Sequence, residues 1–194
     1  MSLMDLIKHR KSIRDFIDRP VERNKIMLCL EAARLAPSAS NSQPWKFIIV
    51  DDQEVKKRLC DNAFGRVQFF NSFAKKAPVI VVIVSEKDKF LTRIGGRLHG
   101  TAYHLIDIGI AGEHFVLQAE ELGLGTCWIG WFDEEAVKST LNVPKDKKID
   151  VLLALGYYSE NSISMEHNRE PLEEIASFNT YSLLERGGEA AKRP

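Results

Sequence analysis

Cysteine is scarce in this chain. Cys29, Cys60 and Cys127 are its only three, and no two of them form a C-x-x-C pair. The sequence therefore indicates neither a disulfide framework nor a zinc site. Cys127 stands in an apolar, strand-like run and is most simply a small core residue. His104 and His114 have no Asp, Glu or His partner at metal-ligand spacing, so we expect no metal.

An excess of charge of either sign is also missing, because 27 Lys and Arg residues balance 27 Asp and Glu residues. A chain with no net charge has no overall electrostatic attraction for nucleic acid or for an anionic membrane, although a local cationic pocket remains compatible with it. The longest purely apolar run, Val79–Val84, is too short to span a bilayer. The first ten residues lack the apolar core of a signal peptide, so we expect a cytoplasmic protein.

Two common phosphate-binding motifs do not occur. No G-x-G-x-x-G follows the first predicted strand, and there is no Walker A sequence. Gly123-x-Gly125 follows a predicted helix, which is the wrong context for a dinucleotide fingerprint. The sequence therefore favours neither a Rossmann cofactor site nor a P-loop.

What remains is an ordinary globular composition in 194 residues, with 44% apolar and 28% charged residues. This size predicts one domain, or a compact subunit that completes its core by oligomerising. We assign the domain to residues 1–180 and a polar tail to 181–194. Apolar periodicity and end signals predict helices at 2–9, 20–35, 53–63, 101–122 and 133–142 and strands at 46–50, 77–84, 126–132 and 149–157.

The helix over 101–122 is apolar around much of its circumference, which predicts a buried helix. Gly109 and Gly112 lower its helix propensity, so a close approach to another helix is one reason for their presence. The charged segment Glu86–Leu98 contains two adjacent glycines and is the best candidate for a mobile or variable region. Within the aromatic cluster at 69–74, Asn71 is the residue suited to a ligand.

The connection after Pro37 is unusually polar. Ser38–Gln43 consists almost entirely of hydroxyl and carboxamide side chains, more hydrogen-bonding capacity than a turn consumes. One interpretation is a solvated loop that satisfies its own backbone. The other is a ligand-facing loop, with Trp45 as a packing anchor behind it.

A second polar segment follows the first helix. In an extended chain Arg10, Ser12 and Arg14 share one side, and two guanidinium groups around a hydroxyl suit a phosphate. The alternative is a solvated basic turn at a helix C-terminus, where cations are favoured in any case.

Five motifs in register carry a family resemblance. In their order and spacing the sequence resembles the FMN-dependent nitroreductase family, from Arg10 to about Ile175. The motifs are Arg10-Lys11-Ser12-x-Arg14-x-Phe16, Ala32-Ala33-Arg34, Pro37-Ser38-Ala39-x-Asn41-x-Gln43-Pro44-Trp45, 122–130 (LGLGTCWIG) and Arg169-x-Pro171-Leu172-Glu173-Glu174.

This resemblance implies an α+β fold with a central, mainly antiparallel sheet flanked by helices. It also implies an intertwined homodimer with two FMN sites at the subunit interface, in which the 37–43 loop reaches the flavin of the partner subunit. The arginine segment, residues 10–14, matches the segment that in this family contacts the FMN phosphate, the ribityl chain and the pyrimidine edge of the ring. By this correspondence the cofactor-binding residues are Arg10, Lys11, Ser12, Arg14, Pro37, Ser38, Ala39, Asn41, Gln43, Asn71, Ile129, Gly130 and Arg169.

The implied activity is NAD(P)H oxidation coupled to reduction of a nitroaromatic, a quinone or a similar flat acceptor. Hydride would pass through flavin N5 in a ping-pong cycle, with NADH or NADPH as donor and no catalytic acid or base. The alternatives are a flavin carrier or sensor, and a specialised member that carries out dehalogenation or flavin fragmentation. His167 stands where many relatives have a basic residue, and Lys75 and Lys76 follow the position of a common lysine.

Overall fold

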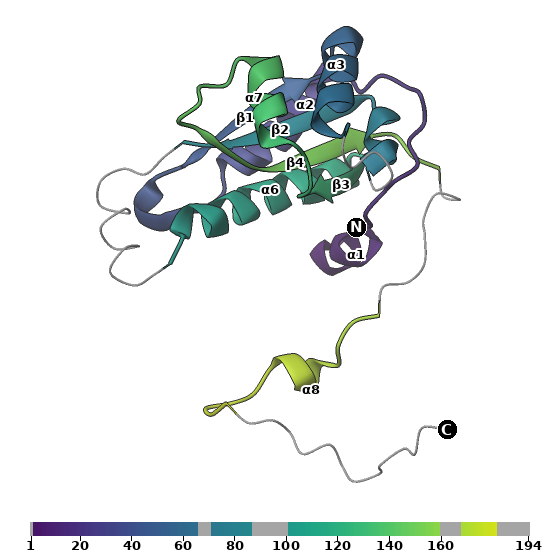
Figure 1. Ribbon diagram of the computed structural model, residues 1–194. Helices are drawn as coiled ribbons and strands as arrows, with labels where there is room; N and C mark the ends of the chain where they lie inside the picture. The colour runs from purple at the N-terminus through teal and green to yellow at the C-terminus, as the bar shows by residue number, and fades with distance from the viewer. Residues whose placement is uncertain (1, 66–70, 87–100, 160–167, 182–194) are drawn as a thin grey trace, which may run out of the picture. The chain divides into compact units, whose positions relative to one another are not determined.

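The computed structural model describes residues 2–65, 71–86, 101–159 and 168–181 (Figure 1). It forms two units, 1–163 and 164–194, which we describe separately. In the second unit the described residues, 168–181, include a short helix, α8 (Leu172–Ile175). The predicted division into a domain at 1–180 and a tail stays a prediction. His167, most of Glu86–Leu98 and residues 182–194 lie outside the described ranges.

Four strands form one antiparallel sheet in the first unit. They are β1 (Trp45–Val50), β2 (Val79–Ser85), β3 (Gly125–Ile129) and β4 (Lys148–Gly156), in the order β1-β2-β4-β3. All three pairings are antiparallel, so the predicted α+β class with an antiparallel sheet is confirmed. β3 lies at one edge of this sheet.

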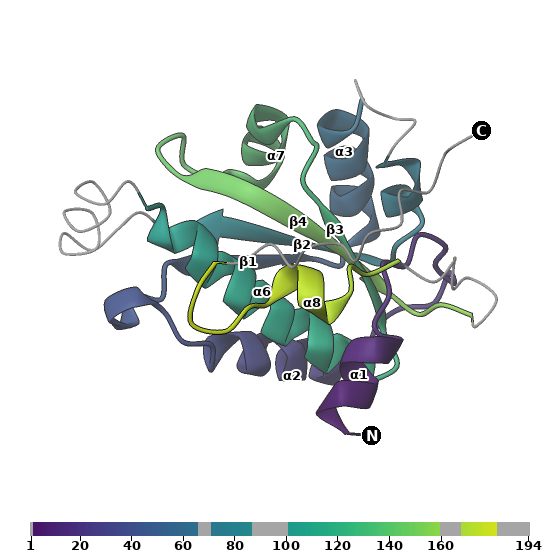
Figure 2. The ribbon, with the colours of Figure 1, turned by 90° about the horizontal axis from the view of Figure 1, so that it is seen from below.

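Helices cover both faces of the sheet (Figures 1 and 2). On one face lie α2 (Arg23–Arg34) and α6 (Tyr103–Glu121), and on the other lie α3 (Gln53–Ala63) and α7 (Glu134–Leu141). Every residue of β2 is buried, as its continuous β-branched run predicts for a strand covered on both sides. Alternate residues of β2 join the two cores, so that Val81 packs with α6 and Val82 packs with α3.

The helix ends follow the predicted local signals. Ser2 and Asp5 form a capping box at the start of α1 (Leu3–His9), and Asp133 caps α7 by accepting a hydrogen bond from the Ala136 amide at 3.0 Å. Gly123, with φ of +73°, ends the turn after α6. The second helix begins at Arg23, three residues after the predicted Pro20, and the extended residue before it, Glu22, makes no side-chain cap.

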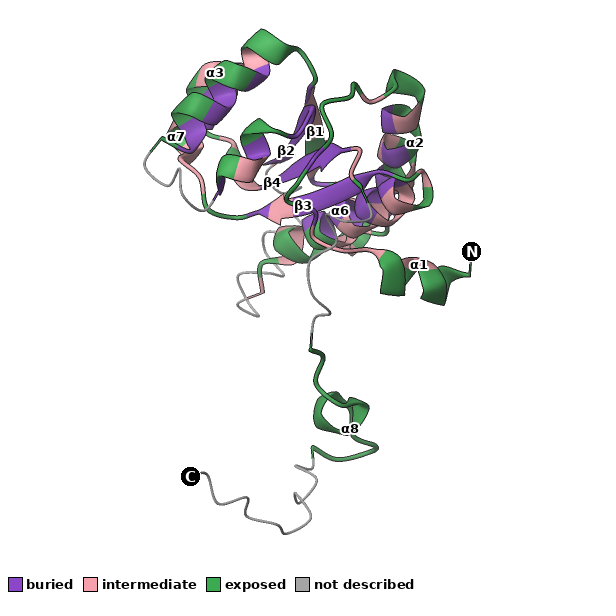
Figure 3. Cartoon of the chain, turned by 90° about the vertical axis from the view of Figure 1, so that its right-hand side faces the viewer, coloured by how far each residue is buried: buried purple, intermediate pink, exposed green. Residues whose placement is uncertain are grey.

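The prediction that α6 is buried around its circumference is wrong for the single chain. Figure 3 shows burial on its inner side, whereas Leu105 and Ile106 are 47% and 52% exposed. The two residues lie on one stripe with Gly109, where an added Cβ would meet no atom within 4 Å. Gly112 is explained differently from its prediction, because the Trp128 ring occupies the space that a Cβ would need. α2 packs along α6, but the atoms nearest to an added Cβ at Gly112 all belong to Trp128.

Candidate functional site

The arginine segment lies extended along the free edge of β3. The Ile13 amide donates to the Thr126 carbonyl at 2.9 Å, and Ser12 forms a parallel bridge with Thr126. Ile13 and Phe16 are buried in the core, while Arg14 is exposed. The buried Ile13 and the exposed Arg14 agree with the predicted period of two, but Phe16, which that period places on the side of Arg14, is buried. Burial of Ile13 therefore fixes the backbone from which Ser12 and Arg14 project.

A glycine in β3 permits this close docking. At Gly125 an added Cβ would lie 2.6 Å from Ile13 Cγ1 and 2.7 Å from Tyr158 Cδ1, which is closer than real Cβ contacts allow. Any larger residue would push the arginine segment away from the sheet. The conformation of the segment is thus encoded in two places far apart in the sequence.

Arg10 and Arg14 are close enough to β3 for their positive charges to act on Cys127. Burial raises the pKa of the Cys127 thiol, and Arg14 and Arg10 oppose that shift. Arg10 also lies near Glu113 and Glu120 of α6, whose pKa values are raised by burial and lowered in part by this guanidinium. Within the described ranges neither arginine forms an ion pair. The segment is therefore a local cationic site on a chain without net charge.

The segment that contains Asn71 and Phe73 lies close to the arginine segment and to the end of β3. Asn71 is buried, and its Nδ2 donates to the Trp131 carbonyl at 2.6 Å. The Arg14 guanidinium lies 5.8 Å from the centre of the Phe73 ring, in the short helix η2 (Ser72–Lys75). The amide nitrogen of Asn71 thus holds the backbone just beyond Gly130. Its predicted contact with a ligand stays a prediction.

Gly130, just after β3, is not covered by any nearby side chain. It is exposed, and an added Cβ would meet no atom within 4 Å. The preceding residue, Ile129, is 2% exposed and anchors the strand in the core. The backbone at Gly130 is therefore accessible to a flat molecule, next to the cationic segment.

The 37–43 loop is ordered by hydrogen bonds of its own. Ser38 Oγ accepts from the Gln43 amide at 2.9 Å, and Gln43 Nε2 donates to Asn41 Oδ1 at 3.0 Å. This agrees in part with the interpretation of a self-satisfied loop. Pro37, Asn41 and Gln43 are exposed, and Ser38 and Ala39 are half-buried, so much of the loop remains available to a ligand.

Asp107 of α6 binds the 37–43 loop, a contact that the sequence did not predict. Its carboxylate accepts from the Ala39 amide at 2.9 Å and from Ser42 Oγ at 3.3 Å, and the residue is 4% exposed. The signal available in the sequence was an acidic residue among the apolar residues of the first half of the helix, between Ile106 and Ile108. That signal identifies a buried carboxylate, but it does not identify the loop that contacts it.

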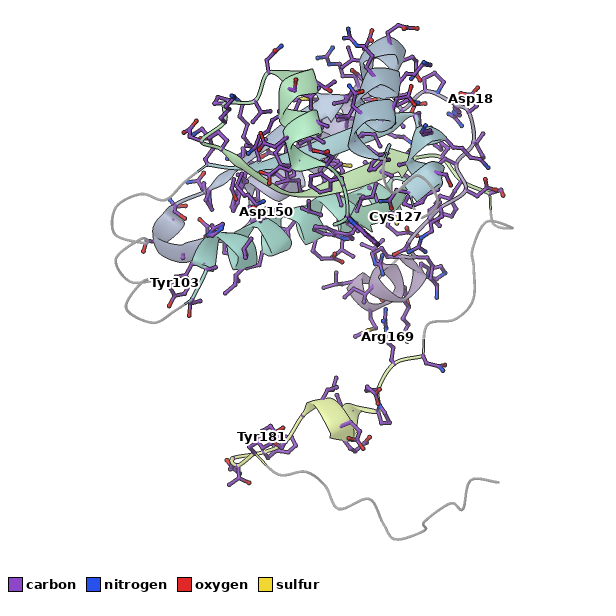
Figure 4. All side chains as sticks on the ribbon, viewed as in Figure 1. Asp18, Tyr103, Cys127, Asp150, Arg169 and Tyr181 are labelled. Carbon is purple, nitrogen blue, oxygen red and sulfur yellow. The ribbon has the colours of Figure 1, made fainter. Side chains whose placement is uncertain are left out.

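The loop and the arginine segment lie at opposite ends of α6. The loop contacts Asp107 near the start of the helix, whereas Arg10 lies near Glu113 and Glu120 toward its end. From 107 to 120 a helix rises about 20 Å. Figures 1 and 2 show η1 (Ala39–Asn41) and α1 at the two ends of α6, and Figure 4 shows Tyr103, at its start, well away from Cys127. One chain therefore does not bring the loop to the arginines.

Three further predicted or considered residues have separate outcomes. Arg169 is exposed in the second unit, so its predicted phosphate contact stays a prediction. Lys75 pairs with Asp61 at 2.8 Å and Lys76 pairs with Asp15 at 3.2 Å. Both pairs are exposed and weak, so both lysines remain able to turn toward a ligand.

Three cavities of about 380, 390 and 270 Å³ lie elsewhere on the first unit. None of the thirteen predicted cofactor-binding residues lines any of them. The residues that are described also contain no cluster of three or more potential metal ligands and no helix long and apolar enough to cross a membrane.

Several known proteins are similar to this chain in sequence and in fold. A relative from Thermus thermophilus named NADH dehydrogenase is 28% identical and covers 86% of this chain and 90% of its own length. An iodotyrosine deiodinase from Thermotoga neapolitana is 28% identical and covers 92% and 98%. The solved structure of an FMN-dependent nitroreductase from Clostridium difficile has a TM-score of 0.74 at 29% identity and covers 92% and 100%.

The family comparison spans most of the chain. The sequence model described as the nitroreductase family matches residues 7–70 and 65–157, which include the arginine segment, the 37–43 loop and β3. This range contains every predicted cofactor-binding residue except Arg169. The chain therefore belongs to the nitroreductase family.

Proposed function

We propose that the protein is an FMN-dependent NAD(P)H oxidoreductase that reduces nitroaromatics, quinones or similar flat electron acceptors. The observation that carries the proposal is the arginine segment, held against β3 by Ile13 beside the open backbone of Gly130. A phosphate needs hydrogen-bond donors and positive charge, and a planar ring needs a backbone without an obstructing side chain. The residues at this edge of the sheet supply both, so they fit FMN.

Each group has a role in holding the cofactor. Arg10, Ser12 and Arg169 would bind the phosphate, with Lys11 adding positive charge, and Arg14 would place positive charge beside the electron-accepting end of the ring. Ile129 and Asn71 fix the backbone around Gly130. When bound, FMN supplies the transfer of reducing equivalents from NAD(P)H to the acceptor. No side chain is assigned as a general acid or base.

We further propose that the working unit is a homodimer in which the 37–43 loop of one copy completes the site of the other. The separation of loop and arginines along α6 supports this, because a second copy can supply the loop that the same chain holds elsewhere. Apolar side chains left exposed at helical spacing support it as well. They are Leu3, Met4 and Ile7 of α1, Met27 and Leu28 of α2 with Leu35 at its C-terminal end, and Leu105 and Ile106 of α6.

The second unit also exposes several large apolar side chains. Leu172, Ile175, Phe178 and Tyr181 are each at least 69% exposed, so this segment buries little of its own apolar surface. A segment of this kind gains stability by packing on another surface. We propose that it packs in the dimer, which is the intertwined arrangement that the family resemblance implies.

Anaerobic titration tests the proposed activity directly. The purified protein is expected to be yellow, or to become so with added FMN, and its absorbance should bleach on titration with NADH or NADPH. A flat acceptor such as a quinone should then restore the colour. A protein that stays colourless and binds no added FMN would contradict the proposal. Flavin that neither nicotinamide reduces at a useful rate would favour a carrier or sensor.

A second candidate function is reductive dehalogenation. It is favoured by the iodotyrosine deiodinase from Thermotoga neapolitana, which this chain matches over 98% of that protein's length. The two candidates share the cofactor site and differ in the acceptor. Release of iodide from iodotyrosine by the reduced protein would support the second candidate. Turnover of nitroaromatics or quinones without iodide release would support the first. The cytoplasmic location stays a prediction from the N-terminal sequence.

Gly130→Ala separates cofactor binding from folding. The added methyl group meets no atom of the chain within 4 Å, so the melting temperature should change by about 2 °C or less. FMN affinity should fall about tenfold or more, because the methyl group would stand between the backbone and the ring. Flavin fluorescence titration and thermal unfolding measure the two effects. Gly125→Ala is the matched comparison, since its methyl group collides with Ile13 and should lower the melting temperature. Unchanged FMN affinity in Gly130→Ala would remove Gly130 from the site.

A further inference from the structure

Asp107 is a buried carboxylate on the inner side of α6. A buried charge is costly unless hydrogen bonds replace the water that it loses. Two hydrogen bonds join it to one segment, because Oδ1 accepts from the Ala39 amide at 2.9 Å and Oδ2 accepts from Ser42 Oγ at 3.3 Å. The side chain thus links the core helix to two points of the 37–43 loop. Its position is explained by what it holds in that loop.

The loop needs such a hold because its backbone is strained. Ser40, Asn41 and Gln43 have φ values of 52°, 51° and 48°, in the left-handed region that residues other than glycine seldom adopt. Strained backbone persists only where its surroundings determine it, and it is frequent in segments that clamp ligands. The internal bonds of the loop join its own residues to one another. Asp107 joins the loop to the rest of the protein.

The same helical turn also presents an exposed apolar surface. Leu105 and Ile106 point away from the core and belong to the surface that we propose for the dimer, while Asp107 points inward to the loop. In the proposed dimer, neighbouring residues of one helical turn would therefore face the second copy and hold the loop. This arrangement would tie the position of the loop to the position of the partner subunit.

We propose that Asp107 is a positioning residue that holds the 37–43 loop in the conformation that contacts the FMN of the partner subunit. This proposal rests on the proposed function, because it takes the loop to face FMN across the dimer. Asp107 itself touches no cofactor. Its carboxylate acts through the Ala39 amide and the Ser42 hydroxyl, which fix both ends of the strained turn.

The test compares three variants of the full-length protein. Asp107→Ala removes both bonds, Asp107→Asn keeps one acceptor oxygen, and Ser42→Ala removes only the hydroxyl bond. Two quantities are measured, the FMN dissociation constant by flavin fluorescence and hydrogen exchange of the loop amides in FMN-free protein. Loss of bonds to a charged group predicts an FMN dissociation constant about tenfold or more above wild type in Asp107→Ala. The FMN dissociation constants of Asp107→Asn and Ser42→Ala should lie between those of wild type and Asp107→Ala. In all three variants, faster hydrogen exchange should be confined to residues 37–43.

Asp150→Asn is the matched control. Asp150 of β4 is half-buried and, like Asp107, has a carboxylate that accepts from a serine hydroxyl, here Ser85 Oγ at 2.7 Å; it lies outside the proposed site. It should leave both FMN affinity and loop exchange at wild-type values. An equal loss of FMN affinity in Asp150→Asn would show a general effect of destabilisation and overturn the proposal.

The remaining outcomes are also decisive. Faster loop exchange with unchanged FMN affinity would mean that the loop does not contact FMN, and unchanged exchange would mean that Asp107 does not hold it. Either result overturns the proposal. Ser42→Ala keeps the test valid if Asp107→Ala does not fold, because its change is small. Failure of the proposed function has a different signature, since the wild-type protein would then bind no FMN at all.

Discussion

Arg14→Ala is expected to raise the FMN dissociation constant about 10- to 100-fold. Hydrogen bonds to a charged group contribute about 1.5–3 kcal/mol, and each 1.4 kcal/mol is a factor of ten in affinity. The fold should tolerate the change because the side chain is exposed and its contact with the Phe73 ring, at 5.8 Å, is worth about 0.5 kcal/mol. Fluorescence titration of the FMN-free protein measures the affinity, and thermal unfolding verifies the fold.

Arg58→Ala is the matched control for Arg14. Arg58 is also exposed and lies on α3, and it is not among the predicted cofactor-binding residues. Its loss removes the same charge from the protein, so any long-range electrostatic effect on an anionic cofactor is reproduced. FMN affinity should stay within about twofold of wild type, because exposed charges beyond a Debye length are screened. Equal losses in the two variants would show that Arg14 makes no specific contact.

Ile106→Glu is expected to convert the dimer into a monomer. In the single chain Ile106 is 52% exposed, so a carboxylate there stays solvated and the monomer should fold. In a symmetric dimer the substitution places two carboxylates at the apolar contact, and an unpaired buried charge costs several kcal/mol. The dimer dissociation constant should therefore rise about a hundredfold or more. Analytical ultracentrifugation at micromolar protein concentration measures this shift.

The same variant should lose FMN, since the partner's loop can no longer reach the arginines. FMN affinity and dimer affinity are therefore expected to fall together over a range of protein concentrations. Arg58→Glu is the control for introduced charge, and it should remain dimeric and retain FMN. A monomeric Ile106→Glu protein that binds FMN as tightly as wild type would contradict the shared site.

Much of the fold could be predicted because its signals are local. The run at 79–84 consists of β-branched residues without interruption, which predicts a strand covered on both faces, and every residue of β2 is buried. Asp133 and Gly123 likewise mark helix ends by their own chemistry. The extended arginine segment was predictable in part, since Ile13 is buried and Arg14 is exposed as the pattern predicts, whereas the burial of Phe16 departs from it.

The contacts that could not be predicted join residues far apart in the chain. Nothing local to Asp107 names Ala39 as its partner, and nothing local to Asn71 names the Trp131 carbonyl. Gly112 was expected to face a helix and instead faces the Trp128 ring. The apolar circumference of α6 was read as full burial, but apolarity alone does not tell whether the covering surface belongs to the same chain or to a second copy.

A mixed dimer tests the central claim, that each FMN is held by the arginine segment of one copy and the loop of the other. Two differently tagged chains are co-expressed and the mixed dimer is purified by both tags, with Arg14→Ala and Asn41→Ala distributed in two ways. When the two changes are in different subunits, both fall in one site, and we predict one intact, tightly bound FMN per dimer. When both changes are in the same subunit, each site is damaged once, and we predict no tightly bound FMN. The reverse result would place the loop and the arginines of one site in the same chain and contradict the account.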